Sequence, residues 1–94
     1  MKADSKPIYR LTLYVAGRSP RSLSAIANLK KICATHLPGR HVVQVIDLQR
    51  HPGKAREHQI LALPTLVRKL PEPVRKILGD LSNTERTLVG LDLV

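Results

Sequence analysis

Aromatic residues are almost missing from this chain of 94 residues, which has no Phe, no Trp and only two Tyr. The hydrophobic core must therefore be aliphatic, and a platform for stacking single-stranded bases is disfavoured. Cysteine is equally scarce, because Cys33 stands alone. A single cysteine permits neither an intramolecular disulfide nor a zinc site with four cysteine ligands. We therefore expect a reduced protein of the cytoplasm.

Acidic residues and long apolar runs are also in short supply. Seven Asp and Glu stand against 16 Lys and Arg, which gives a formal net charge of +9. No run approaches the ~20 apolar residues that a membrane span needs. Residues 1–7 contain no apolar stretch of the kind that forms a secretory signal, and we expect them to be flexible. The length predicts one domain over residues 1–94.

The first half of the chain has a strand–helix–strand pattern. Alternating apolar residues over 8–15 predict a strand, and Pro20 with Ser19 as its cap predicts the start of a helix. The helix should end at the Pro-Gly dipeptide 38–39. The nearly continuous apolar run over 41–48 predicts an interior strand that is covered on both faces. Such a unit folds with parallel strands and a right-handed crossover.

The second half of the chain fits two arrangements. Residues 74–78 alternate as a strand does, but they also follow helical spacing behind Pro73. Residues 87–93 also fit both a strand and a helix, although the capping box 82–85 favours a helix there. A short polar helix is expected over 53–61. Two segments with divided preferences are unusual in so short a chain, because local and global signals normally agree.

Two residues weaken the helical interpretation of the last segment. Gly90 costs a helix interior about 1 kcal/mol relative to Ala, and Asp92 opposes the dipole at a helix C-terminus. On the sequence alone, Gly90→Ala and Asp92→Arg should therefore each favour the helix.

Catalytic chemistry has no recognisable place in this sequence. Strand, helix and strand followed by Leu63-Pro64 resemble a thioredoxin-like plan, in which the bond before the proline is cis and a cysteine pair begins the first helix. Ser19 and Ser22 occupy those two positions, and a hydroxyl does not exchange disulfides at neutral pH. We interpret Cys33 as a buried structural residue and the four histidines as surface residues. We predict no enzyme, no cofactor and no metal.

The basic residues are dispersed rather than gathered into one block. A solvated surface, an acidic protein partner and nucleic acid are three interpretations of the surplus, and nucleic acid is the least favoured of them. Arg68, Lys69, Arg75 and Lys76 flank the prolines of segment 71–73. A hairpin turn at that segment would gather the four side chains into one exposed basic corner.

Several segments of the chain form a recognisable set, which consists of Leu13-Tyr14-Val15-Ala16-Gly17, Val45-Ile46-Asp47, Pro64-Thr65-Leu66, residues 73–83 and Gly90-Leu91-Asp92-Leu93. Together these segments resemble the KaiB family of circadian clock proteins. The resemblance covers the chain from about residue 9 to residue 94. Its most specific part is the Gly-Asp-Leu-Ser-Asn sequence at 79–83 with Gly-Leu-Asp-Leu behind it.

The resemblance implies one α/β domain that interconverts between two folds. One is a thioredoxin-like monomer with the element order βαβαββα. The other is a ground state with the order βαββααβ, which forms a homo-tetramer or dimer. The two folds exchange strand and helix in the segments whose preferences are divided. The positions that match the family's switch region are Pro64, Pro71, Pro73, Gly90 and Asp92.

The resemblance also implies a non-enzymatic role. Family members bind the ring-shaped ATPase KaiC and change its phosphorylation state or its other partners. A kinase of the SasA type, whose sensor domain is related, would compete for the same site. We assign partner binding to Arg68, Arg75 and Lys76, of which the first two match basic family positions near KaiC. The alternatives are a thioredoxin-like redox protein without its CxxC and a basic nucleic-acid-binding module. Daily rhythm and stress response both stay open as outputs.

Overall fold

The computed structural model describes residues 7–93, so the flexibility expected of residues 1–7 lies, apart from Pro7, outside the described range. Four strands form one sheet in the order β2-β1-β3-β4. β1 and β2 are parallel, and the other two neighbouring pairs are antiparallel. The elements are β1 (Tyr9–Val15), α1 (Pro20–His36), β2 (His41–Asp47), the 3-10 helix η1 (Pro52–Arg56), β3 (Thr65–Leu70), β4 (Arg75–Leu78) and α2 (Thr84–Gly90).

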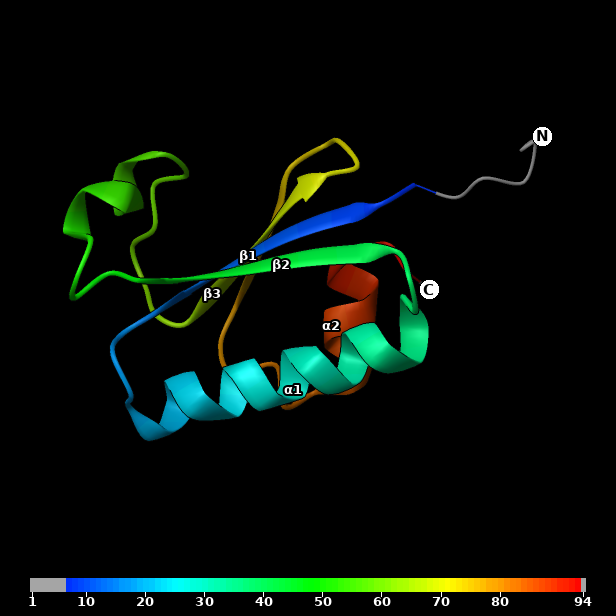
Figure 1. Cartoon of the computed structure of the whole chain (residues 1–94), viewed down its shortest axis with the longest axis horizontal. Helices are drawn as coiled ribbons and strands as arrows, with labels where there is room; N and C mark the ends of the chain where they lie inside the picture. Colours follow the sequence, from blue (N-terminus) through cyan, green and yellow to red (C-terminus); the bar gives the residue numbers. More distant parts are fainter. Residues whose placement is uncertain (1–6, 94) are drawn as a thin grey trace.

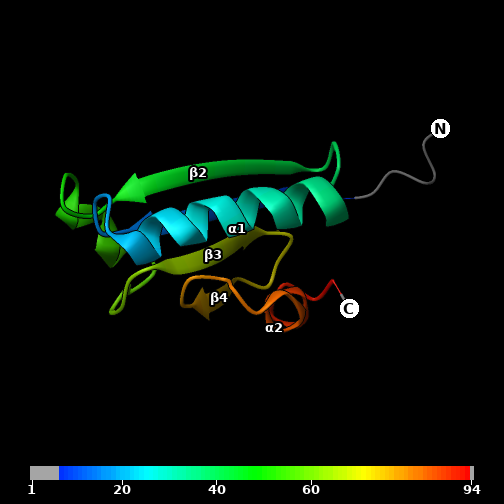
Figure 2. The same cartoon turned by 90° about the horizontal axis from the view of Figure 1, so that it is seen from below.

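Both α-helices lie on one face of the sheet, and η1 lies at one end of the other face (Figures 1 and 2). Leu11, Leu13 and Val15 of β1 enter the larger core beneath the helices. Tyr14 of the same strand enters a smaller core on the η1 side. The alternation predicted over 8–15 is therefore confirmed, and β1 is buried on both faces because each face has its own cover.

β2 is an edge strand, which corrects the prediction of an interior strand over 41–48. Val42, Val43 and Val45 are 49%, 38% and 45% exposed. The interior places in the sheet belong to β1 and β3. A continuous apolar run does not by itself distinguish a doubly covered strand from an exposed edge of valines, because the two share the same sequence pattern.

α1 begins and ends where the sequence predicts. The Ser19 hydroxyl accepts a hydrogen bond from a backbone N–H of the first turn, and Pro20 takes the first helical position. At the other end the N–H of Leu37 bonds to the Cys33 carbonyl at 2.9 Å. Gly39 follows with φ +71°, a conformation that favours glycine.

η1 is shorter than the helix predicted over 53–61. It spans only Pro52–Arg56, and none of its residues is buried. Ala55 and Ile60 are the apolar residues of this region that pack against Tyr14. Two such contacts are too few for an amphipathic face, and without tertiary packing a helix this short is not stable.

The divided segments of the second half adopt the thioredoxin-like arrangement. Residues 75–78 form β4, which pairs with β3, and residues 84–90 form α2. The helix cap is Asn83, whose Oδ1 accepts from the N–H of Arg86 at 3.0 Å. The capping box predicted over 82–85 is therefore displaced by one residue. The second arrangement stays a prediction.

Candidate functional site

The two serines at the thiol positions serve as a helix cap. The Oγ atoms of Ser19 and Ser22 are 2.8 Å apart, and the Ser22 N–H donates to the Ser19 hydroxyl at 3.2 Å. The N–H of Ala16 in turn donates to the Ser22 hydroxyl at 3.0 Å. Both hydroxyls are thus engaged in holding the turn between β1 and α1. The place where a thioredoxin-like protein has its redox pair has a structural role here.

Cys33 is also unsuited to redox chemistry. It lies on the core side of α1 and is 1% exposed. Burial raises the pKa of its thiol to about 11, whereas a reactive cysteine needs a lowered pKa and access to solvent. The prediction of a buried structural cysteine is confirmed.

A cleft lies beside the proline loop that precedes β3. The peptide bond between Leu63 and Pro64 is cis, as the thioredoxin-like plan predicts, and those before Pro71 and Pro73 are cis as well. The cleft has a volume of about 350 Å³, and Arg21 and Asp80 contribute to its wall. Hydrogen bonds from Ser82, with smaller help from the Arg21 charge, lower the pKa of the Asp80 carboxyl.

Arg68 is a buried residue, which corrects the prediction that it lies exposed in a basic corner. It is 2% exposed and points from β3 to the helix side of the sheet. Its Nη1 donates to the Leu91 carbonyl at 2.7 Å, and its Nη2 donates to the Pro73 carbonyl at 2.8 Å. The guanidinium carbon also lies 5.9 Å from the centre of the Tyr9 ring. Arg68 therefore connects β1, the β3–β4 turn and the end of α2.

Asp92 completes this connection from the C-terminal side. It follows α2 with φ +59°, and its Oδ2 lies 3.3 Å from Arg68 Nη1 and 3.2 Å from Arg75 Nε. The unfavourable position predicted for an anion behind a helix is thus compensated by two cations. Asp92→Arg would remove these contacts and place a third cation beside them, which competes with the gain predicted from the helix dipole, and the net effect stays a prediction. We call Arg68, Arg75 and Asp92 the arginine clamp.

The basic corner predicted from the sequence is divided between two faces of the sheet. Arg75 pairs in register with Arg68 on the helix side, where its side chain is 49% exposed. Lys76 pairs with Val67 and points to the opposite face, together with Lys69. Residues that alternate along a strand cannot share one surface, because successive side chains point to opposite faces. The sequence reasoning missed this separation, although the alternation itself could have indicated it.

Gly90 sits where α2 meets β4. A Cβ atom at this position would lie 2.8 Å from Cγ1 and 3.0 Å from Cδ1 of Ile77. An alanine at this position would therefore require the Ile77 side chain to move. The gain in helix propensity expected from Gly90→Ala therefore competes with a steric conflict, and its net effect stays a prediction.

The described part of the chain offers no other obvious chemical centre. Within residues 7–93 no group of three or more His, Cys, Asp or Glu side chains lies close enough to hold a metal ion. No helix in the same range has the length and apolar character needed to cross a membrane.

Fold and site together define a thioredoxin-like domain whose thiol positions have become structural and whose C-terminal segment is fixed by the arginine clamp. Family comparison then identifies the lineage: residues 12–93 match the model of the KaiB domain. The chain belongs to the KaiB family, as the resemblance in the sequence predicts.

Known proteins agree with this placement. The circadian clock oscillator protein KaiB of Picosynechococcus sp. is 51% identical over 89 residues, which cover 95% of this chain and 86% of that protein. The relatives are named as clock proteins. Among solved structures, the N-terminal domain of Synechococcus elongatus SasA has a TM-score of 0.74 at 22% identity, covering 96% of this chain and 89% of that one. Mitochondrial thioredoxin 3 from Saccharomyces cerevisiae has a TM-score of 0.72 at 18% identity, covering 93% and 80%. These two likenesses show the fold.

Proposed function

We propose that this protein is a non-enzymatic adaptor of the KaiB type, which docks on a KaiC-type ring ATPase and alters its phosphorylation state or its other partners. The observation that supports this most is the combination of family membership with serines in place of redox thiols. A thioredoxin-like domain without a thiol pair cannot exchange disulfides, but its surface can still bind a partner. The SasA-like fold supports a second element of the proposal, in which a SasA-type kinase competes for the same site on the ring. We place this protein in the cytoplasm, because its single cysteine, Cys33, forms no intramolecular disulfide and the cytoplasm keeps thiols reduced.

We assign partner binding to the exposed cations Arg75 and Lys76. The buried Arg68 contributes indirectly. Because Arg68 is buried, its contribution is to hold Arg75 and Asp92 in place. An acidic surface on the ring is the chemistry that complements these groups, since rim charges mainly accelerate association.

The binding test is a pull-down with the KaiC homologue of the same organism, with and without ATP. We expect Arg75→Glu with Lys76→Glu to slow association at low salt, and the defect should shrink as salt screens the charges. Arg50→Glu with Arg56→Glu, which reverses two other exposed arginines, is the control with the same change in net charge and should have a smaller effect. Absence of wild-type binding under both nucleotide conditions would refute the adaptor role.

Fold switching is the second part of the proposal. The β3–β4–α2 segment carries all five switch positions, namely Pro64, Pro71, Pro73, Gly90 and Asp92, which lie at its entrance, in its turn and at its end. The arginine clamp favours the thioredoxin-like arrangement, so weakening it should populate the ground-state oligomer. Backbone NMR assignment of strand and helix over 74–78 and 87–93, with size-exclusion chromatography, tests this. A clamp variant that unfolds without yielding a second folded form would contradict it.

A further inference from the structure

The side of β2 that faces α1 is only partly covered. The side chains of Val43 and Val45 line the space between this strand and the helix, and both remain exposed. On the neighbouring strand, Leu11 and Leu13 lie beneath the helices and are buried. Among residues 7–93 no segment fills the space over the two valines. The fold therefore leaves apolar surface of the sheet open beside the helix.

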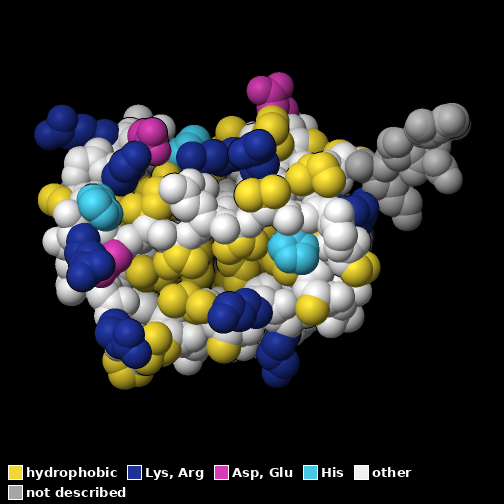
Figure 3. Space-filling model, in the orientation of Figure 1, with side chains coloured by type: hydrophobic (Ala, Val, Ile, Leu, Met, Phe, Trp, Pro, Cys, Tyr) yellow, Lys and Arg dark blue, Asp and Glu magenta, His cyan; other side chains and the backbone are white. Residues whose placement is uncertain are grey.

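A groove of about 420 Å³ occupies this space between β2 and α1. Leu13, Leu29 and Cys33 are the buried residues that form its base. Ile26 and Ala34 of α1 contribute to one wall, and the two valines of β2 contribute to the other. Figure 3 shows hydrophobic side chains gathered in this hollow. A mostly apolar depression of this size is typical of a site for a small molecule.

The groove is separate from the hydrogen-bonding edge of β2. The Leu48 N–H donates to the Val15 carbonyl, and the Arg40 carbonyl accepts from the Tyr9 N–H. The even-numbered residues of β2 therefore direct their backbone groups to β1. Because this direction alternates along a strand, the odd-numbered residues direct theirs to the free edge, in the plane of the sheet. The side chains that line the groove stand perpendicular to that plane, so a ligand in the groove needs no backbone pairing with β2.

The two walls of the groove have nearly the same length. From Ile26 to Ala34 the helix rises ~12 Å, and from His41 to Val45 the strand extends ~13 Å. Because α1 runs antiparallel to β2 (Figure 2), Ala34 lies at the His41 end and Ile26 lies at the Val45 end. An extended alkyl chain advances ~1.25 Å per carbon, since a C–C bond measures about 1.5 Å. The walls therefore match a chain of about ten carbons.

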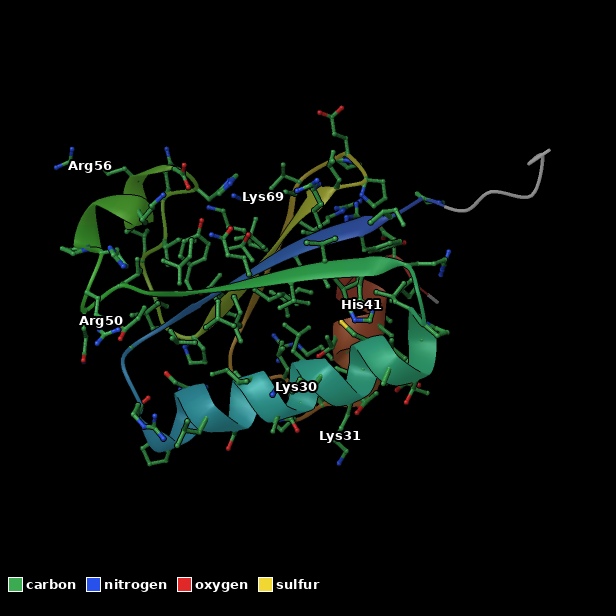
Figure 4. All side chains as sticks on the ribbon, viewed as in Figure 1. Lys30, Lys31, His41, Arg50, Arg56 and Lys69 are labelled. Atoms are coloured by element: carbon green, nitrogen blue, oxygen red, sulfur yellow. The ribbon has the colours of Figure 1, made fainter. Side chains whose placement is uncertain are left out.

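The polar groups at the groove are basic. Lys30 and His41 line it, and none of its lining residues is acidic. Figure 4 shows Lys30 on α1 and His41 at the beginning of β2, both beside the groove. The Nδ1–H of His41 donates to the Leu37 carbonyl at 2.7 Å, so Nε2 of the neutral ring can only accept a hydrogen bond. Lys30 is therefore the group that binds an anion, and its flexible stem lets the ammonium reach either end of the groove.

We propose that this groove binds a free medium-chain fatty acid. The alkyl chain lies between α1 and β2, where it covers the exposed surface of Val43 and Val45. The carboxylate pairs with the ammonium of Lys30 at the rim. The charge of the rim selects an anion, and the length of the walls selects a chain of about ten carbons. The longer chains of membrane phospholipids would extend beyond both walls.

A series of fatty acids tests the ligand class. Isothermal titration calorimetry of the wild type with decanoate should give a dissociation constant of about 1 mM or lower, as expected for about a dozen heavy atoms. From hexanoate to decanoate the affinity should rise about two- to fourfold per CH₂ group, and it should level off at longer chains. Decylammonium, which has the same chain and the opposite charge, should bind at least about tenfold more weakly.

Three results of this series would overturn the proposal. Absence of decanoate binding would leave the groove to a segment of another protein. An affinity that keeps rising beyond about ten carbons would indicate association with an extended surface, as at a membrane. Equal binding of decanoate and decylammonium would show that Lys30 does not select the charge of the ligand.

Two matched pairs of variants test the site. Lys30→Gln removes the charge at the rim and should weaken decanoate binding at least about threefold. Lys31→Gln is its control, because Lys31 is exposed and points away from β2 (Figure 4). Ala34→Leu fills the groove and should weaken binding at least about tenfold. Ala27→Leu makes the same change at an exposed position of α1 outside the groove lining. Equal effects within either pair would overturn the proposal.

Methyl NMR locates the ligand independently. Decanoate should shift the methyl signals of Val43 and Val45, whereas those of Leu61 and Leu78, which are exposed outside the groove, should stay unchanged. Equal shifts at all four residues would mean non-specific association and would overturn the proposal. All these measurements use this chain alone, so none depends on binding to a ring ATPase.

Discussion

The two edge strands of the sheet, β2 and β4, differ in how well they are protected against pairing with other strands. β2 has seven residues, exposed valines and a continuous register with its neighbour. β4 has four residues, follows a turn with two prolines, and presents Arg75 and Lys76. Short length, proline and charge are the devices that keep an edge from pairing. One edge is thus protected in its own sequence, and the other is left open.

The difference follows the division of the chain into two halves. The open edge belongs to the β1–α1–β2 unit, whose sequence predicts one structure. The protected edge belongs to β3–β4–α2, whose sequence fits two. A segment that rearranges exposes its strands transiently, and unpaired edges are then an aggregation hazard. Protection is therefore placed where the fold is least uniquely specified.

The largest expected effect comes from breaking the clamp that holds the protected edge. Asp92→Arg removes the half-exposed carboxylate that contacts both Arg68 and Arg75, and it places a third cation beside them. The loss should be about 2 kcal/mol for the thioredoxin-like arrangement, because hydrogen bonds between charged groups are lost and like charges are brought together. Urea unfolding followed by circular dichroism measures it.

Asp92→Asn is the matched control for this change. Asn tolerates the left-handed backbone and can still accept a hydrogen bond, so about half of the loss should be recovered. If Asp92→Arg proves as stable as the wild type and keeps α2, the clamp does not hold the C-terminal segment.

A smaller effect should distinguish the residues of β2 whose N–H groups face β1 from those whose N–H groups face solvent. Val42 directs its N–H to β1, so Val42→Pro should cost about 1–3 kcal/mol through a lost ladder bond. Val43 directs its N–H to solvent, and Val43→Pro should cost less than about 1 kcal/mol in the monomer. Thermal unfolding of dilute samples compares them. Equal losses would mean that the assignment of inward and outward groups is wrong.

A third prediction concerns the contact between α2 and β4. Gly90→Ala gains about 1 kcal/mol of helix propensity but forces Ile77 to move, which costs about 1–3 kcal/mol. We expect net destabilisation of about 1 kcal/mol. In an Ile77→Ala background the same change should be stabilising. A double-mutant cycle measures the coupling, and additive effects would show that the steric conflict is absent.

The smallest effect is the pH dependence of the loop between β1 and α1. Hydrogen bonds from the N–H groups of Gln49 and Gly17 hold the pKa of the Asp47 carboxyl below its ordinary value of 3.8. Folding thus favours the ionised form, so its contribution is present above that value and is lost as pH falls through the lowered pKa. Asp47→Asn should flatten the decline in unfolding free energy between pH 5 and 2. An unchanged slope would assign the decline to other carboxylates.

The sequence predicts β1 and α1 well because local signals suffice for them. Alternation, a serine cap and a Pro-Gly stop act within a few residues of each other. The order of strands is set by pairing at long range, so the edge position of β2 was predicted wrongly. The length of η1 depends on how many apolar contacts the small core offers, which the segment's own sequence does not reveal.

The predicted site residues differ in how the structure places them. Family resemblance proposes Gly90 and Asp92 as switch positions, which stays a prediction, and the structure shows both residues in close contacts with β3 and β4. The exposure of Arg68 was wrong, because a charged residue in a strand is buried only when distant groups satisfy it. Those groups come from the turn and from the end of α2, 5 and 23 residues away. No pattern in the sequence around Arg68 predicts these distant partners.

The position of β1 between the two halves makes it a reporter of both. The Tyr9 N–H and the Val15 carbonyl face β2, so by alternation Leu11 and Leu13 direct their amides there as well. Thr12 and Tyr14 direct theirs to β3. When β3–β4–α2 opens, the amides of Thr12 and Tyr14 should exchange with deuterium, while those of Leu11 and Leu13 stay protected. Two adjacent residues on one strand would thus record the lifetimes of two separate units.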